Sequence, residues 1–107
     1  MKIEKTDRRI TVMTDGDFDL HICPELKALL EEDLKDHRVT HVCFDLSKTS
    51  FIDSSGLGLI LYIYKQTAPY GGKVSVINAS PPAAKLFEMA GLDELLNLRR
   101  KGREKLG

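Results

Sequence analysis

Several features that mark other classes of protein are missing from this chain of 107 residues. It has no tryptophan and only two cysteines, Cys23 and Cys43, which form no CxxC pair and, with three scattered histidines, lack the spacing of a metal site. We therefore expect reduced, packed thiols and no bound metal. No apolar run is long enough to span a bilayer and no signal peptide opens the chain, so we expect a cytoplasmic protein that does not enter a membrane.

The chain also lacks an excess of charge of either sign. Lysine plus arginine equals aspartate plus glutamate, at 16 each, so no overall field attracts nucleic acid or anionic lipid. The one local asymmetry is a basic stretch over 99–107, which we interpret as a solvated, partly frayed tail. Apolar residues make up 42% of a chain that has room for one core but not two, which predicts a single domain over 1–107. We expect a monomer, because no unpaired apolar stripe is obvious in the sequence.

The spacing of apolar residues predicts strands and helices in alternation. The predicted strands cover 10–14, 39–46 and 73–78, with a weaker strand at Ile3. The predicted helices run from Pro24 to about Leu34, from about Ser54 to Thr67, and from Pro81 to near Gly91. This order predicts an α/β fold with right-handed crossovers and a small mixed, mostly parallel sheet of about four to five strands flanked by helices. The first strands would add an antiparallel edge.

The segments between these elements are predicted to lack regular structure. Residues 16–19 are assigned to a turn after the first strand, and residues 47–53 to a loop before the second helix. Gly56 and Gly58 lower the helix propensity of that helix by about 1 kcal/mol each. We expect both glycines to allow close approach of another backbone to the first helical turn.

The most informative segment is the sequence FIDSSGLG at 51–58, which places two hydroxyls and a carboxylate where a helix begins. Unpaired N–H groups at such an end favour negative charge, so a phosphate added here could be held by those donors. Either Asp53 or Ser54 could cap the helix, and capping alone could explain the segment. It is not a GxSxG sequence, it lacks the third glycine of a dinucleotide fingerprint, and no P-loop sequence occurs in the chain.

Two interpretations that involve chemistry stay open at this point. Ser54 could be the nucleophile of a hydrolase, although no base or orienting group is evident. Asp17, Asp19 and Asp53 could bind Mg²⁺ if they converge, although aspartates in loops more often form turns and caps. The non-catalytic interpretation is favoured over both.

Asp45-Leu46 followed by the 51–58 segment resembles the signature of the STAS domain, specifically that of bacterial anti-sigma factor antagonists. Upstream, the sequence at 16–19 is similar to the family's turn of glycine, acidic, apolar and aspartate residues. The resemblance covers about Ile10 to Leu98 and continues through Tyr64-Lys65, Gly71-Gly72, Asn78-Ala79-Ser80-Pro81, Leu86-Phe87 and Gly91-Leu92. It implies a single-domain STAS fold. This chain departs from the family in one respect, since the last helix that is usual in the family is short or absent here.

The resemblance implies a non-enzymatic partner switch. In the family the unmodified antagonist binds a cytoplasmic anti-sigma factor that is also a serine kinase, and the sigma factor is released. The kinase then phosphorylates the first serine of the DSSG motif, here Ser54, which abolishes binding until a phosphatase removes the phosphate. ATP and Mg²⁺ belong to the kinase, so we expect no cofactor in this chain. The residues expected to shape the surroundings of the phosphosite and bind the partner are Asp19, Asp53, Ser55, Gly56, Leu57 and Gly58.

A second function from a different class is the alternative. Stand-alone STAS subunits also dock on the ATPase of membrane lipid-transport complexes, and these subunits keep a related motif. Ser54 alone therefore does not distinguish the two functions. An exposed apolar or basic docking face would distinguish them.

Overall fold

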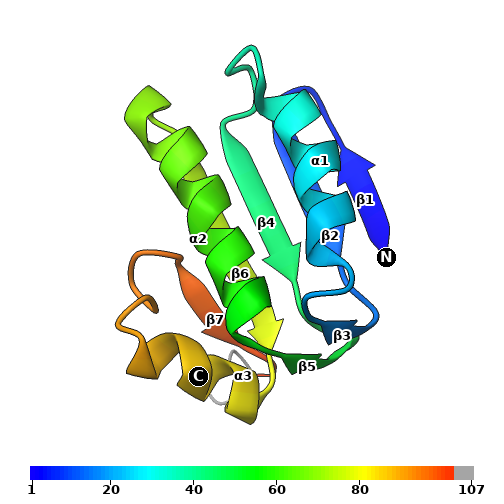
Figure 1. Ribbon diagram of the computed structural model, residues 1–107. Coiled ribbons are helices and arrows are strands. Elements are labelled where there is room, and N and C mark those ends of the chain that lie inside the picture. Colours follow the sequence, from blue (N-terminus) through cyan, green and yellow to red (C-terminus); the bar gives the residue numbers. More distant parts are fainter. Residues whose placement is uncertain (103–107) are drawn as a thin grey trace.

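The computed structural model describes residues 1–102, which form a five-stranded sheet, a two-stranded sheet and three α-helices (Figure 1). The strands are β1 Lys2–Lys5, β2 Arg9–Met13, β3 Gly16–Phe18, β4 His41–Asp45, β5 Thr49–Ile52, β6 Lys73–Ala79 and β7 Leu98–Arg100. The helices are α1 Cys23–Leu34, α2 Ser54–Thr67 and α3 Pro81–Met89, with a 3₁₀ turn η1 at Ala68–Tyr70. None of these helices has the length and apolar character that a bilayer crossing requires.

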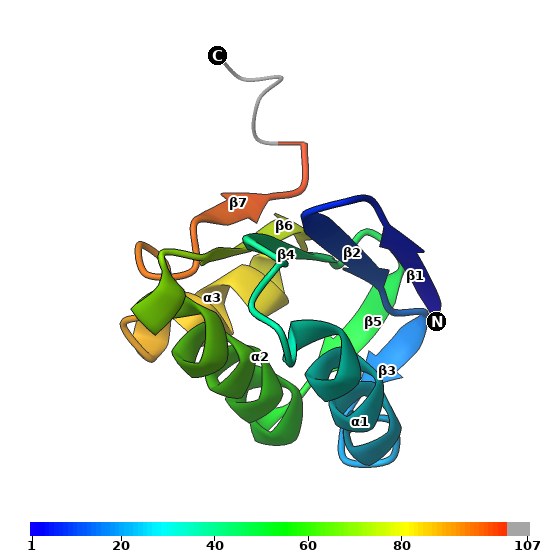
Figure 2. The same cartoon turned by 90° about the horizontal axis from the view of Figure 1, so that it is seen from above.

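The large sheet has the strand order β1-β2-β4-β6-β7, in which β1 is antiparallel to β2 and the other neighbours are parallel. This confirms the mixed, mostly parallel sheet with an antiparallel edge. Figure 2 shows α1, α2 and α3 together on one face of the sheet. Within residues 1–102 no helix covers the opposite face, so the sheet has one packed face and one open face.

The core lies between the packed face and the three helices. Phe18, Phe44 and Phe87 are fully buried there, with Val12 and Val76 from the sheet. Burial of each such side chain contributes about 1.5–3 kcal/mol. The helices add Leu26, Leu30 and Leu34 from α1, Leu59, Ile60 and Ile63 from α2, and Ala83 and Ala84 from α3.

The predicted helix ends agree with the structure. Helix α2 covers Ser54–Thr67 as expected, and Ser80 caps α3 by accepting a hydrogen bond from the N–H of Ala83 at 3.4 Å. Gly91 adopts a φ of 73°, the left-handed conformation that glycine takes beyond a helix. Leu29 has the helical spacing of the buried leucines of α1 but is 45% exposed.

Two predictions for the connecting segments are wrong. Most of the expected turn at 16–19 is strand β3, and most of the expected loop at 47–53 is strand β5, which pairs in parallel with β3. The side chain of Thr49 ties this small sheet to the large one, since its hydroxyl donates to the carbonyl of Thr14 at 3.0 Å. The expected tail at 99–107 begins in strand β7, where Arg100 pairs with Glu88 at 2.6 Å. Residues 103–107 lie outside the described residues.

Candidate functional site

Asp53 is the residue that caps α2, which settles the choice between Asp53 and Ser54. Its backbone is extended, with φ −109° and ψ −172°, as an N-cap requires. One carboxylate oxygen accepts hydrogen bonds from the N–H of Ser55 at 2.8 Å and of Gly56 at 3.2 Å. The carbonyl of Asp53 accepts from Leu57 at 3.1 Å, which closes the first helical turn.

Ser54 follows as the first residue of α2, and it is exposed. Within residues 1–102 its hydroxyl makes no hydrogen bond to a histidine or a carboxylate, so the arrangement that a nucleophilic serine needs is not formed. The same exposure leaves the hydroxyl accessible to an enzyme that modifies it. Ser55, the second hydroxyl of the segment, is half-buried.

The expected role of the helix N–H groups has to be corrected. The N–H groups of Ser55 and Gly56 are occupied by the carboxylate of Asp53, so they are not available donors for a phosphate on Ser54. A phosphate there would instead lie next to that carboxylate. The local effect of phosphorylation is therefore added negative charge beside existing negative charge.

Of the two glycines in the first turn, only Gly56 has a close neighbour. A Cβ added at Gly56 would lie 2.6 Å from the carbonyl oxygen of Phe18 and 2.9 Å from side-chain atoms of Phe18 and Ile52. A Cβ added at Gly58 would meet nothing within 4 Å, so the expectation for Gly58 is wrong. The close contact at Gly56 holds the start of α2 against the end of β3.

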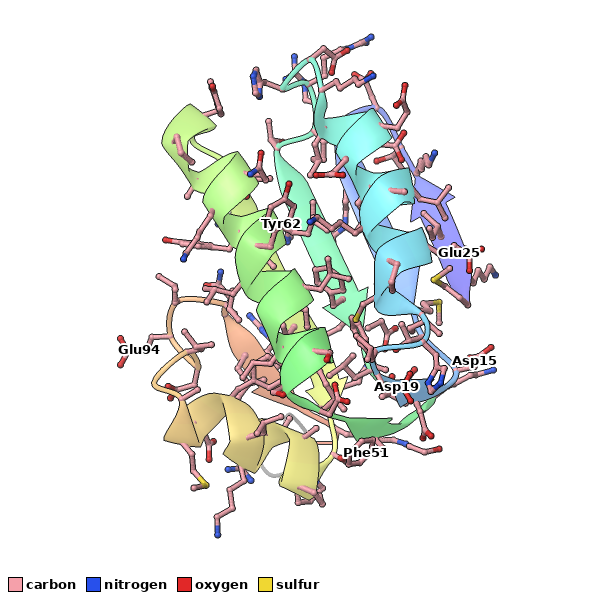
Figure 3. The ribbon with its side chains drawn as sticks, in the orientation of Figure 1. Asp15, Asp19, Glu25, Phe51, Tyr62 and Glu94 are labelled. Carbon is pink, nitrogen blue, oxygen red and sulfur yellow. The ribbon has the colours of Figure 1, made fainter. Side chains whose placement is uncertain are left out.

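Asp19 lies at the same end of the molecule as Phe51, which stands two residues before Asp53 in the sequence (Figure 3). It accepts a hydrogen bond from the N–H of His21 at 3.0 Å, and the ring of His21 lies 3.5 Å from its carboxylate. Both carboxylates are close to Cys23, whose pKa is raised by burial, by Asp53 and by Asp19. Asp17 does not join them in a metal site, since residues 1–102 contain no cluster of three or more ligands of the kind that binds a cation.

An apolar groove runs beside this end of α2, between α1 and α2. Its volume is about 410 Å³. Leu20 at its edge is 66% exposed, and Phe51, on β5 close to Ser54, is 54% exposed. Sequence reasoning did not identify Leu20, although an apolar residue directly after the Gly-Asp-Phe-Asp segment was a usable signal. The residues that line the groove are Leu20, Cys23, Pro24, Lys27, Ser55, Gly58, Leu59 and Tyr62.

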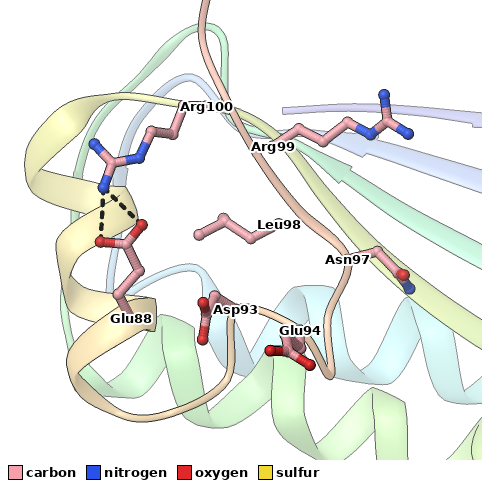
Figure 4. Close-up of a pocket in the computed structure, with 7 residues that line it drawn as sticks. All are labelled: Glu88, Asp93, Glu94, Asn97, Leu98, Arg99 and Arg100. Carbon is pink, nitrogen blue, oxygen red and sulfur yellow. Dashed lines mark hydrogen bonds and ion pairs between the residues drawn. The ribbon is translucent and has the colours of Figure 1, made fainter. Parts of the chain in front are cut away.

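A cavity of about 710 Å³ lies elsewhere, between α3 and β7 (Figure 4). Its wall combines charges of both signs, and the ion pair of Arg100 with Glu88 crosses it. It touches none of the residues expected at the phosphosite. The groove at α2, although smaller, is therefore the better candidate for a partner surface.

Comparison with known proteins agrees with this fold. The family model of the STAS domain matches residues 1–104, so the chain belongs to the STAS domain family. Among its curated relatives is the anti-sigma F factor antagonist of Paenibacillus polymyxa, which is 31% identical over 98 residues, covering 90% of this chain and 84% of the relative. The anti-sigma-B factor antagonist of Bacillus subtilis is 25% identical over 99 residues, covering 92% of this chain and 89% of that protein.

Solved structures share the fold. The anti-sigma factor antagonist SpoIIAA in its unphosphorylated form superimposes with a TM-score of 0.85 at 24% identity, covering 98% of this chain and 90% of that chain. The Bacillus cell fate determinant SpoIIAA in the phosphorylated form gives 0.79 at 24% identity, covering 98% of this chain and 94% of that chain. The α/β architecture of this chain is thus the STAS fold.

Proposed function

We propose that this chain is an anti-sigma factor antagonist whose binding is switched off by phosphorylation of Ser54. The unphosphorylated form binds an anti-sigma factor that is also a serine kinase, and thereby frees a sigma factor. The observation that carries the proposal is the position of Ser54, which is exposed, directly follows the capping Asp53, and adjoins exposed apolar surface. The names of the curated relatives support the same function.

The surface beside Ser54 suits a protein partner. Leu20 and Phe51 are large apolar side chains that are more than half exposed, and the groove between α1 and α2 provides a concave surface. Covering such surface with a partner stabilises a complex by about 25 cal/mol per Å² buried, before the costs of association. Leu57, in the first turn of α2, is half-buried and packs against the core.

Phosphorylation would oppose that complex through charge. A phosphate adds about −1.5 to −2 charges at neutral pH. On Ser54 this charge would stand beside the carboxylate of Asp53, which already accepts the hydrogen bonds of the first helical turn. A partner that covers Ser54 would have to desolvate both anions, so the complex loses free energy while the fold of the antagonist changes little.

The chain acts in this scheme by binding and not by catalysis. ATP and Mg²⁺ belong to the partner kinase, and a separate phosphatase restores the unphosphorylated form. The antagonist acts as a monomer in the cytoplasm, where its partners are found. Burial raises the pKa of both Cys23 and Cys43, in keeping with reduced thiols that take no part in the switch.

The proposal is tested by affinity capture from a lysate of the source organism, with wild type, Ser54→Asp and Thr6→Asp side by side. Thr6 is exposed in the β1–β2 turn, so Thr6→Asp adds the same charge away from the site. Wild type and Thr6→Asp should both retain a small ATP-binding serine kinase, and Ser54→Asp should retain much less. Aspartate carries a single charge, so a partial loss is expected.

Two results would contradict the proposal. One is retention of the kinase by Ser54→Asp at the wild-type level. The other is capture of a transporter ATPase by all three proteins alike. That second result would make the chain a subunit of a lipid-transport complex, with Ser54 serving only in the first turn of α2.

A further inference from the structure

The open face of the sheet carries a second group of polar side chains, which come from strands far from Ser54 in the sequence. Along β2, β4 and β6 the residues that alternate with the core residues point to this face. In the middle of the face lies a cavity of about 400 Å³. It is lined by Arg9, His41, Cys43, Ser75, Ile77, Asn78, Arg99 and Arg100.

Three of these side chains form a hydrogen-bonded row across neighbouring strands. A nitrogen of the Arg9 guanidinium lies 2.9 Å from Nδ1 of His41, and Nε2 of His41 lies 2.8 Å from the hydroxyl of Ser75. Arginine can only donate, so Nδ1 of neutral His41 accepts and Nε2 carries the proton and donates to Ser75. The hydroxyl hydrogen of Ser75 is then left to donate to a further group. The row therefore presents donors to the cavity from Arg9 at one end and Ser75 at the other.

A second arginine approaches from the other edge of the sheet. Figure 4 shows that Arg100 turns toward Glu88, with which it is paired, while Arg99 points in the other direction, over the strands. Alternation along β7 gives the same result, since Leu98 packs against the core and Arg99 must face away from it. Within residues 1–102 neither Arg9 nor Arg99 is in an ion pair with a carboxylate.

A carboxylate beside this cavity is already engaged. Asp45 also belongs to the open face, and one of its oxygens accepts hydrogen bonds from the side chain of Asn78 at 3.1 Å and from the N–H of Ser47 at 2.9 Å. Burial would raise the pKa of Asp45, but these hydrogen bonds outweigh it and hold that pKa below its usual value. Asp45 thus stays ionised because of its hydrogen bonds to Asn78 and Ser47. Arg9 and Arg99 therefore remain able to bind an external anion.

We propose that the open face of the sheet binds a small soluble phosphorylated molecule in the cavity that Arg9, Ser75 and Arg99 line. Phosphoryl oxygens accept hydrogen bonds from arginine guanidinium groups and from hydroxyl groups. Hydrogen bonds to an ionised group are about twice as strong as those between neutral groups. The cavity has the size of small-molecule sites, which span about 300–1,000 Å³. The site is separate from Ser54 and does not depend on the partner switch.

His41 reports on this site. Burial, Arg9 and Lys73 lower the pKa of His41. The groups that face it are Arg9 from β2, Lys73 and Ser75 from β6, and Cys43 on its own strand. A bound oxyanion would offset the repulsion from the two cations and favour the protonated ring, so it should raise that pKa. The other histidines, His21 and His37, lie outside the cavity and serve as internal controls.

The test is an NMR titration of the full-length protein with inorganic phosphate, at constant ionic strength maintained with sodium chloride. The resonances of the His41 ring should shift and saturate, while those of His21 and His37 should stay in place. Arg9→Gln and Arg99→Gln should each weaken the apparent affinity by about tenfold, since each removes a charge-assisted hydrogen bond. Arg8→Gln removes the same charge from an exposed neighbour outside the cavity and should leave the affinity unchanged.

Three outcomes would overturn the proposal. The first is the absence of a saturable shift at His41, or a parallel shift of all three histidines, which indicates an unspecific salt effect. The second is that Arg99→Gln and Arg8→Gln change the apparent affinity for phosphate equally. The third comes from sedimentation with phosphatidylcholine vesicles that contain or lack an anionic phospholipid. Binding to the anionic vesicles without any response to free phosphate would replace the soluble ligand with a membrane surface.

Discussion

Gly56 lies against the carbonyl oxygen of Phe18 so closely that a Cβ added to the glycine would stand 2.6 Å from that oxygen. Two segments that the sequence places far apart, the end of β3 and the start of α2, are held together by this contact. It fixes the direction in which α2 leaves the small sheet. It thereby fixes the position of Ser54, two residues before Gly56.

Gly56→Ala and Gly58→Ala should therefore have opposite effects on stability. Gly56→Ala forces a backbone or side-chain shift and should lower the free energy of unfolding by about 1–3 kcal/mol. Gly58→Ala meets no neighbour within 4 Å and should raise that free energy by up to about 1 kcal/mol, because alanine favours the helix. Urea denaturation of both variants measures the difference. A Gly56→Ala variant as stable as Gly58→Ala would show that the close approach to Phe18 is relieved without cost.

Asp53 should contribute to stability as a cap and to the switch as a charge. Asp53→Ala removes the acceptor for the N–H groups of Ser55 and Gly56 and should cost about 1 kcal/mol of unfolding free energy. Asp53→Ser keeps a capping oxygen and should cost only a few tenths of a kcal/mol. Urea denaturation separates the two variants.

Asp53→Ser also isolates the contribution of charge. If the phosphate on Ser54 acts partly through the neighbouring carboxylate, phosphorylation should reduce partner affinity less in Asp53→Ser than in wild type. Calorimetry on the phosphorylated and unphosphorylated forms of both proteins gives the comparison. An identical loss in both would assign the whole effect to the phosphate itself.

The pH dependence of stability should carry a contribution from His41. Its pKa is lowered in the folded state by burial, Arg9 and Lys73, while in the unfolded chain it returns to about 6.5. Between these two values the unfolded state binds more protons, so the free energy of unfolding should fall as the pH drops below about 6.5. His41→Gln can keep the hydrogen bonds to Arg9 and Ser75 without titrating.

Urea midpoints measured at a series of pH values test this contribution. The two stability curves should run parallel above about pH 7, and wild type should then lose stability faster on acidification. Curves that stay parallel down to pH 5 would show that His41 keeps its ordinary pKa.

The elements with periodic apolar residues were predictable from the sequence, and those held by tertiary contacts were not. Helix α2 was predicted with its observed bounds because its apolar residues repeat at helical spacing and a capping residue precedes them. Strands β3 and β5 were missed because they are three and four residues long and carry no alternation. They pair with each other and not with a sequence neighbour, and the register is irregular at Gly16. Pairing of that kind is fixed by the packing of Phe18 and Ile52, which local patterns do not encode.

The site was predictable in position but not in detail. The predicted start of the helix and the DSSG motif located Ser54 and Asp53. The sequence could not show that the Asp53 carboxylate accepts hydrogen bonds from the N–H groups that a phosphate would need. The second glycine of the motif was given the same role as the first, because the two are identical in the sequence and differ only in what lies opposite them. Leu20 and Phe51 were not recognised as surface, since exposure of an apolar side chain is decided by the whole fold.

The most direct test of the switch is the affinity of the purified anti-sigma factor of the source organism for three forms of this chain, measured by calorimetry. The forms are unphosphorylated wild type, wild type phosphorylated on Ser54 as mapped by mass spectrometry, and Ser54→Ala treated with the same kinase and ATP. Unphosphorylated wild type and treated Ser54→Ala should bind equally well. The phosphorylated form should bind at least about tenfold more weakly, because two adjacent anions must be desolvated at the interface. Equal affinity of all three forms, or phosphorylation of the half-buried Ser55 in place of Ser54, would contradict the account.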